Sequence, residues 1–228
     1  MIPFPKKKVP RDVALKDLRI LEREYPNPTT ALQYRNPYEL LIAVILSAQC
    51  TDERVNMTTP ALFARYPSPR DLAAAKPHDV EKLIKSCGFF RMKTKSIIGA
   101  ARALAEQYDG VVPEQREALE ALPGVGRKTA SVVMANAFAE PALAVDTHVF
   151  RVSHRLGLTL GKTPRAVEDD LTALLPKRKW GNATHWLILH GRKICKAPVP
   201  RCGECPLNSL CPTPAIIARH RSLPRQPR

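Results

Sequence analysis

Apolar side chains recur along most of the chain at the three- and four-residue spacing of an amphipathic helix. Residues 14–25 carry such a stripe before Pro26 and Pro28, and proline ends a helix because it has no backbone N–H to donate. A second stripe covers residues 38–48. Further helices are predicted at about 52–64, 77–86 and 91–108, on both sides of a turn at 123–126, and from about residues 146, 164 and 182. Alternating stretches long enough to build a sheet are lacking, so the pattern predicts an all-α fold.

Both ends of the chain depart from this pattern. The first dozen residues are basic and contain prolines, and residues 212–228 are rich in Pro and Arg. We expect both ends to be flexible. No apolar run reaches the length of about 18 residues that a membrane span needs, and the N-terminus lacks the apolar core of a secretion signal. We therefore expect no membrane partner and a cytoplasmic protein, nucleoid-associated if its source is bacterial.

The charge of the chain is strongly positive and concentrated in two stretches. Thirty-six Lys and Arg face 21 Asp and Glu, which gives a net charge of +15. Residues 82–102 hold six basic side chains and no acidic one, and residues 171–203 hold seven and none. Such clustering favours a binding face for a polyanion. Composition alone leaves acidic membranes and ribosomal RNA open beside DNA.

The segment PGVG at residues 123–126 lies between two predicted helices. Pro123 ends the first helix, and Gly124 and Gly126 permit backbone angles that other residues avoid. The first N–H groups of the second helix have no partner within it and suit a phosphate. Arg127 and Lys128 begin that helix, and taken alone they predict phosphate contacts or solvated charges.

Four of the six cysteines crowd into 17 residues near the C-terminus, with the spacing Cys-x6-Cys-x2-Cys-x5-Cys; they are Cys195, Cys202, Cys205 and Cys211. In a chain without a secretion signal, such a cluster predicts a metal centre rather than disulfides. The spacing alone leaves zinc and an iron–sulfur cluster both open. Cys50 and Cys87 are isolated, and we expect them to be small core residues.

Four motifs carry a resemblance to a known family. They are LLIAVILSAQCTD at 40–52, VPEQREALEALPGVGRKTASVV at 112–133, AVDTHVFRV at 144–152 and HWLILHGRKIC at 185–195. The chain resembles the endonuclease III branch of the helix-hairpin-helix DNA glycosylases over nearly all of residues 12–211. The resemblance implies a two-lobed fold in which a helical barrel domain, residues 30–140, carries the hairpin. Residues 1–29 and 141–228 would form the iron–sulfur cluster domain, and DNA would bind in the cleft between the lobes.

The resemblance also implies an activity for Lys128 and Asp146, the catalytic pair of this family. The chain is expected to be a bifunctional DNA glycosylase and AP lyase that removes oxidised pyrimidines. A Schiff base on Lys128 would then cut the strand 3′ to the abasic site by β-elimination. The adenine-mismatch branch lacks this lysine. Asp146 has a second interpretation, because Asp at a helix start is also a good N-cap.

The partner that the resemblance implies is double-stranded DNA with damaged or abasic nucleotides, bound by a monomer. The hairpin residues Gly124, Val125, Gly126 and Arg127 would contact its backbone. Gln49 and Phe89 would fill the gap left by a flipped-out base, with Arg91 beside them. The alternatives are a buried amide at Gln49 and core packing at Phe89 and Phe90. The Phe89-Phe90-Arg91-Met92 loop departs from the family pattern, which leaves the lesion range open.

For the four cysteines, the resemblance favours a [4Fe-4S] cluster over zinc. Lys196 and Arg201, in the loop between the first two ligands, would contact phosphates. His148 is expected near the catalytic cleft, and none of the histidines is assigned as a metal ligand. The remaining alternatives are a mismatch or UV-dimer glycosylase on the same scaffold, and a non-catalytic DNA-binding iron–sulfur protein.

Overall fold

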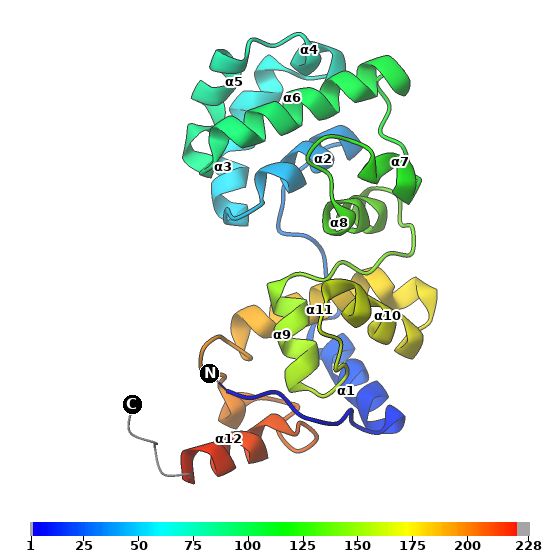
Figure 1. The fold of residues 1–228 in the computed structure, drawn as a ribbon, viewed down its shortest axis with the longest axis vertical. Coiled ribbons are helices and arrows are strands. Elements are labelled where there is room, and N and C mark those ends of the chain that lie inside the picture. The colour runs from blue at the N-terminus through cyan, green and yellow to red at the C-terminus, as the bar shows by residue number, and fades with distance from the viewer. Residues whose placement is uncertain (1, 223–228) are drawn as a thin grey trace. The chain divides into compact units, whose positions relative to one another are not determined.

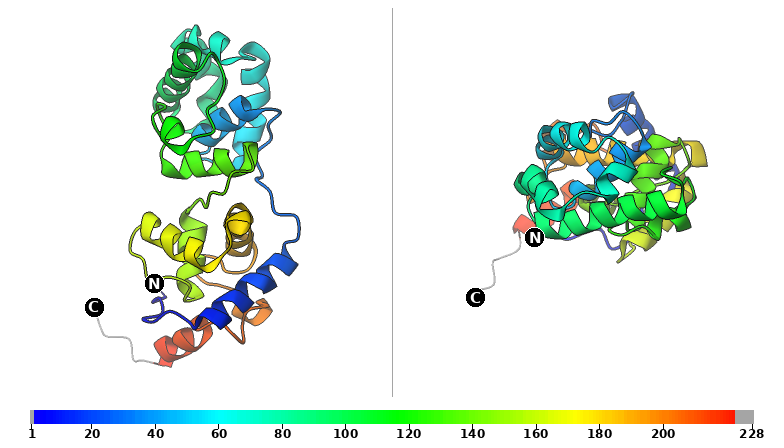
Figure 2. Two further views of the ribbon diagram at one scale, coloured as in Figure 1. Left: turned by 90° about the vertical axis from the view of Figure 1, so that its right-hand side faces the viewer. Right: turned by 90° about the horizontal axis from the view of Figure 1, so that it is seen from above.

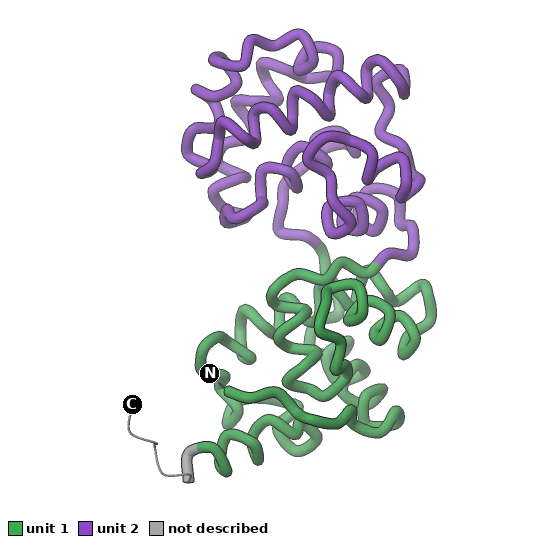
Figure 3. The backbone as a smooth tube through the Cα atoms, in the orientation of Figure 1, with its two compact units in different colours: residues 1–29, 143–228 green, residues 30–142 purple. Residues whose placement is uncertain are grey.

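In a computed structural model, which describes residues 2–222, the described chain folds into twelve α-helices and three short 3₁₀ helices without a strand (Figure 1). The predicted all-α fold is therefore confirmed. The helices pack into two compact units, each with its own apolar core. Unit 2 is residues 30–142, and unit 1 combines residues 1–29 with 143–228 (Figure 3). None of the helices in this described part has the length and apolar character to cross a membrane.

Unit 2 is built around α2, and its helices are α2 (Pro37–Leu46), α3 (Asp52–Arg65), α4 (Pro69–Ala73), α5 (Pro77–Ile84), η1 (Lys85–Cys87), α6 (Phe90–Gln107), α7 (Arg116–Glu120) and α8 (Arg127–Ala137). Nine of the ten residues of α2 are buried, because α3, α6 and α8 all pack on it. The single stripe predicted over residues 38–48 is therefore wrong in two ways. The helix is buried on nearly all sides, and Ala48 is an exposed residue beyond its end.

Unit 1 joins the start of the chain to its end, and its helices are α1 (Arg11–Glu24), α9 (Thr147–Arg155), α10 (Pro164–Leu174), η2 (Lys177–Lys179), α11 (Trp180–Lys193), η3 (Cys202–Glu204) and α12 (Thr213–Ser222). The predicted stripe of α1 buries Ala14, Leu18 and Leu21. It packs against α10 and α11, as Figure 2 shows. Trp186 of α11 is fully buried in the same core. Within the described residues, the helices that contact α1 most are therefore α10 and α11, which come late in the chain.

Both predictions of flexible ends are wrong for the described residues. Near the N-terminus, the Val9 N–H donates to Gly157 O at 2.9 Å and Lys8 Nζ lies 2.6 Å from Asp170 Oδ1. Residues 213–222 form α12, whose first residue Thr213 is buried and donates to Arg155 O at 2.6 Å. Both segments are held in place by residues that are distant in the sequence. The local composition of each segment does not reveal such contacts. Residues 223–228 of the second prediction lie outside the described residues.

Asp17 is a buried carboxylic acid on α1. It is fully buried, and among the described side chains and backbone groups neither of its carboxylate oxygens has a hydrogen-bond partner. Burial raises the pKa of Asp17 from its ordinary value of 3.8 to about 7, because a charged carboxylate is poorly solvated inside a protein. Asp17 therefore destabilises unit 1 whenever it is ionised.

We expect the Asp17→Asn variant to gain stability over the wild type as the pH rises from about 4 to about 7. In that range the unfolded wild type releases the Asp17 proton while the folded protein keeps it, so folding becomes less favourable. The upper limit of the gain is ~4 kcal/mol, set by the pKa difference. Denaturant unfolding of both proteins across this range measures it. If the difference in unfolding free energy between the two proteins does not change with pH, the raised pKa of Asp17 is contradicted.

Candidate nucleic-acid interface and cysteine pocket

The hairpin turn of unit 2 is held in place by the core. Val125 is buried, and its N–H donates to Leu122 O at 3.0 Å. Gly124 has a φ of +79°, and a Cβ added there would lie 2.5 Å from Ser96 Cβ on α6. The predicted need for unusual backbone angles is confirmed at Gly124 but wrong at Gly126. Gly126 is the extended N-cap of α8 with a φ of −96°, and glycine there leaves open space in front of the helix start.

The start of α8 combines open backbone with positive charge. A Cβ added at Gly126 would have no atom within 4 Å apart from its chain neighbours, so the space in front of the helix start is open at this position. Lys128 is exposed at this end. Arg127 lies beside it, with Nη1 3.8 Å from Glu120 Oε1. Helix N-termini favour anions through their N–H groups and their dipole, so this surface suits a phosphate.

We expect replacement of each hairpin glycine by alanine to have a different main effect: a loss of stability at Gly124 and a loss of DNA binding at Gly126. Gly124→Ala should destabilise unit 2 by about 2 kcal/mol or more, because it adds a left-handed backbone to a clash with Ser96. Gly126→Ala should cost less than about 1 kcal/mol, the range of N-cap replacements, yet weaken duplex DNA binding because the methyl group meets the phosphate. Thermal unfolding and fluorescence anisotropy separate the two effects. Equal losses of stability in both variants would contradict this division.

Asp146 occupies the N-cap of α9 in unit 1. Its Oδ1 accepts from the Val149 N–H at 2.7 Å, which confirms the capping interpretation. The side chain is half-buried. The cap fixes the carboxylate in one orientation, so it is a rigid negative charge. Lys128 lies on unit 2 and Asp146 on unit 1.

Three other polar side chains share the surroundings of Asp146. Burial lowers the pKa of His148, and Asp146 opposes that shift. Burial likewise lowers the pKa of His185, again with Asp146 opposing it. Arg151 places Nη2 3.2 Å from His148 Nδ1 and donates to Gly191 O at 3.1 Å. Arg151 was not predicted; its place on the same helix, five residues after Asp146, was the only signal.

Two loops of unit 2 carry the residues predicted to enter DNA. Gln49 has a φ of 52° and Phe89 a φ of 47°, a left-handed backbone that side-chain-bearing residues seldom adopt. Gln49 is exposed, so its alternative as a buried amide is wrong. Phe89 is 65% exposed, whereas Phe90 packs on the core with the Arg91 guanidinium carbon 5.7 Å from its ring centre. Core packing therefore holds for Phe90 and not for Phe89.

The basic stretch 82–102 supplies one cation fewer to the surface than its composition indicates. Lys93 is buried, and its Nζ donates to Cys87 O. The other five basic side chains of the stretch are exposed. In the second stretch, Lys196 and Arg201 are exposed, and Lys179 Nζ lies 2.7 Å from Glu22 Oε2. Both stretches therefore keep a positive surface.

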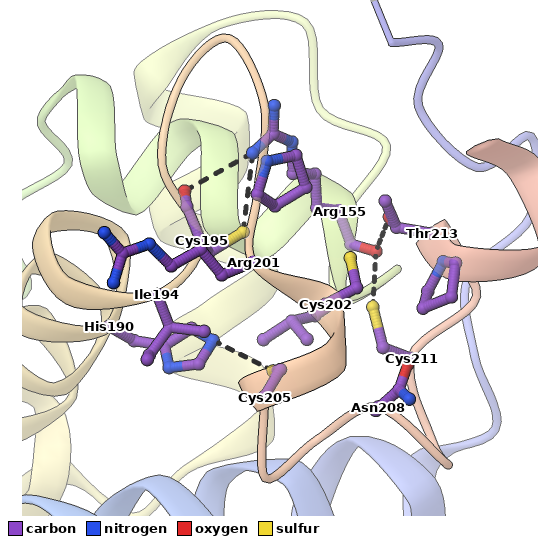
Figure 4. Close-up of a pocket in the computed structure, with 13 residues that line it drawn as sticks. Arg155, His190, Ile194, Cys195, Arg201, Cys202, Cys205, Asn208, Cys211 and Thr213 are labelled. Carbon is purple, nitrogen blue, oxygen red and sulfur yellow. Dashed lines mark hydrogen bonds between the residues drawn. The ribbon is translucent and has the colours of Figure 1, made fainter.

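The four clustered cysteines line one pocket of unit 1, and Figure 4 shows their sulfur atoms around it. Cys195 follows α11, Cys202 and Cys205 flank η3, and Cys211 precedes α12. Burial raises the pKa of the Cys202 and Cys205 thiols, and that of Cys211 to about 12. These three thiols therefore stay protonated at neutral pH unless a cation replaces their protons.

Arg155 supports the same pocket from α9. Its Nη1 lies 3.6 Å from Cys195 Sγ and donates to Lys196 O at 2.7 Å, and its Nη2 donates to Pro198 O at 3.2 Å. The described residues contain no group of three His, Cys, Asp or Glu side chains already in metal-binding geometry. The donor chemistry fits an iron–sulfur centre nevertheless, because four soft thiols face a largely apolar pocket beside a buried cation.

A protein-family model matches more than half of this chain, including the hairpin. The family described as "HhH-GPD superfamily base excision DNA repair protein" matches residues 42–177. The chain belongs to this superfamily of DNA repair proteins.

Its relatives narrow the class further. The chain is 52% identical to endonuclease III of Synechocystis sp., over 88% of this chain and 92% of that protein. It is 47% identical to endonuclease III of Escherichia coli K12, over 86% and 93%. A solved structure of a trapped covalent intermediate of endonuclease III with DNA matches with a TM-score of 0.88 and 42% identity, covering 93% of this chain and 100% of that chain. Within the superfamily the chain is a member of the endonuclease III family, the DNA glycosylases and AP lyases of base excision repair.

Proposed function

We propose that this enzyme removes oxidised pyrimidines from double-stranded DNA and cuts the strand through a Schiff base on Lys128. The observation that carries the proposal is an exposed lysine at the open start of α8, next to a turn suited to phosphate. A similar endonuclease III has been captured in a covalent intermediate with DNA, which requires a nucleophile on that protein. One chain supplies every residue of the mechanism, so we propose a monomer.

The chemistry begins at the sugar of the damaged nucleotide. As the C1′–N bond breaks, positive charge builds on the sugar, and the fixed carboxylate of Asp146 stabilises it. The base leaves with the bonding electrons and a proton. The Lys128 amine, having lost a proton, bonds to C1′, and opening of the sugar ring gives the imine. The imine acidifies the C2′ proton, whose removal expels the 3′ phosphate. Water then hydrolyses the imine and restores Lys128.

Base removal requires the damaged nucleotide to leave the helix. Gln49 and Phe89 are exposed side chains on two loops of unit 2, and we propose that they occupy the space that the nucleotide leaves. The aromatic ring of Phe89 can stack on a neighbouring base, and the Gln49 amide can bond to the unpaired one. Arg91, Lys196 and Arg201 then contact backbone phosphates.

The four clustered cysteines would hold a [4Fe-4S] cluster. Bound there, the cluster would cross-link the segments around η3 and α12 to α11 and so shape the loop that carries Lys196 and Arg201. Arg155 keeps this loop in place by donating to the carbonyls of Lys196 and Pro198. The four cysteines and their cluster would have a structural role, because the β-elimination needs no metal ion.

We expect the Cys211→Ser variant to lose most of its iron and its visible absorption, because one of four thiolates is missing. Cys50→Ser is the matched control, since Cys50 lies in unit 2 and should leave the iron content unchanged. Iron and sulfide analysis of anaerobically purified protein measures both. A colourless wild type that contains zinc would overturn the assignment.

Borohydride trapping on a panel of duplexes tests the proposed substrate range. The wild type should form an adduct with duplexes carrying an oxidised pyrimidine or an abasic site, and not with mismatched or UV-damaged ones. Adducts only with a mismatch or a UV dimer would assign the enzyme to those lesions instead. DNA binding without any adduct would indicate a non-catalytic protein.

A further inference from the structure

Two consecutive residues before the first turn of α6 have backbone angles that few residues adopt. Gly88 has a φ of 56° and a ψ of 152°, a region essentially confined to glycine. Phe89 follows with a φ of 47° and a ψ of 27°, the left-handed conformation that side-chain-bearing residues avoid. The Phe89 side chain is also exposed. Contacts elsewhere must therefore hold this turn, because neither the backbone preference of Phe89 nor burial of its ring stabilises it.

A single residue of α6, Lys93, bonds to both ends of the turn. Its side-chain Nζ donates to Cys87 O, directly before Gly88, and its backbone N–H donates to Phe89 O at 3.1 Å. The backbone bond is the first of α6, and any residue at this position except proline could make it. The side-chain bond needs a long donor. Cys87 is buried at 1% exposure, so the Lys93 side chain ties the turn to a fixed part of the core.

Lys93 is an unfavourable residue for core packing alone. It is 5% exposed, and within the described part of the chain its side chain bonds to Cys87 O without a carboxylate partner. Burial lowers the pKa of Lys93, since an ammonium group is poorly solvated inside a protein. An apolar side chain of similar volume would avoid this cost. The hydrogen bond to Cys87 O therefore explains the lysine better than packing does, and the proposed repair chemistry does not use it.

We propose that Lys93 is a positioning residue that holds Phe89 in the orientation with which it enters DNA, a role that rests on the proposed function. Lys93 is buried, so it acts through the turn and not by contacting DNA. Because the turn is fixed before DNA binds, Phe89 does not have to be ordered when it stacks on a base. Without the side-chain bond, the cost of ordering the turn would offset the stacking contact.

The Lys93→Met variant tests this role in the full-length protein with its metal centre intact. It should melt no lower than the wild type, because it replaces a buried ammonium group by an apolar side chain. Its affinity for an abasic-site duplex should nevertheless fall about tenfold, the value of one stacking contact. Lys76→Met is the matched control, since it also removes one positive charge from unit 2 but at an exposed position. It should match the wild type in both measurements.

Thermal unfolding and fluorescence anisotropy give the two values. A Lys93→Met protein that melts well below the wild type, or does not fold, would make Lys93 a core residue and overturn the proposal. An unchanged affinity for the duplex would overturn it as well.

Combining Lys93→Met with Phe89→Ala shows whether Lys93 acts through Phe89. Phe89→Ala alone should bind the duplex about tenfold more weakly than the wild type. The double variant should bind no more weakly than Phe89→Ala, because the turn then has no ring to position. Losses that multiply to about a hundredfold would show that Lys93 acts by another route, which contradicts the proposal.

Amide hydrogen exchange measures the turn in the absence of DNA. The N–H of residue 93, which donates to Phe89 O, should exchange about tenfold faster in Lys93→Met than in the wild type, the value of one charge-assisted hydrogen bond. Equal exchange in the two proteins would overturn the positioning role, whatever the DNA measurements show. Faster exchange together with a Phe89→Ala variant that binds as the wild type does would support the positioning of the turn and refute the proposed role of Phe89 in DNA.

Discussion

Lys128→Ala is expected to lose strand cleavage and the borohydride-trapped adduct together. The amine is the only group in the proposed mechanism that bonds to C1′, and removal of a catalytic nucleophile typically costs about 10³-fold or more in rate. Lys128 is exposed at the start of α8, so the fold should be unaffected. Single-turnover cleavage of an abasic duplex gives the rate, and denaturing gel electrophoresis shows the adduct.

Two further variants separate a nucleophile from a phosphate contact. Lys128→Arg keeps the positive charge and should bind duplex DNA nearly as well as the wild type, yet form no adduct. Lys76→Ala removes another exposed lysine of unit 2, at the start of α5, and should leave cleavage unchanged. An adduct of undiminished yield in Lys128→Ala would assign the Schiff base to another amine.

Asp146→Asn is expected to lower base removal by about 10² to 10³-fold, the usual range for losing one electrostatic partner of a transition state. Asn caps a helix nearly as well as Asp, so Val149 N–H keeps an acceptor and stability should change by only a few tenths of a kcal/mol. Asp146 also raises the pKa of His148, so that pKa should fall further in the variant. Single-turnover glycosylase assays and histidine NMR titration measure the two effects.

The capping role of Asp146 is measured by a second pair of variants. Asp146→Ala should lose the same activity and also about 1 kcal/mol of stability, because the cap is removed. Thr163→Ala removes the cap of α10 in the same unit, where Thr163 Oγ1 accepts from Ala166 N–H at 3.2 Å. It should lose similar stability and keep full activity. Full activity in Asp146→Asn would show that Asp146 acts only as a helix cap.

Helix spacing predicted the long helices well and the short, contact-dependent elements poorly. α1, α3 and α6 were predictable because each carries a stripe over several turns. The five-residue α4 was missed, since one turn is too short to show a period; its capping box of Ser68 and Asp71 was the available signal. The ordered N-terminus and α12 depend on partners distant in sequence, such as Gly157 and Arg155.

The features of the candidate site also fall into two groups, those predictable from a local motif and those that depend on distant contacts. Gly124, the cap at Asp146 and the crowded cysteines lie in local motifs whose geometry follows from neighbouring residues. The buried Lys93 does not, because its hydrogen bond to Cys87 O forms only when α6 packs on η1. Composition even assigned Lys93 to a surface. Burial and non-local contact were the two properties that the linear pattern could not supply.

The discontinuous core of unit 1 has a consequence for synthesis on the ribosome. α1 is the first helix to emerge, but its partners α10 and α11 are among the last. Residues 30–142 of unit 2 emerge complete while Leu18 and Leu21 still lack Trp186 and Leu187. Between the synthesis of residue 142 and that of α11, the growing chain therefore carries a complete unit 2 and a first helix whose apolar face is still uncovered. That helix is where a nascent-chain chaperone would find this protein.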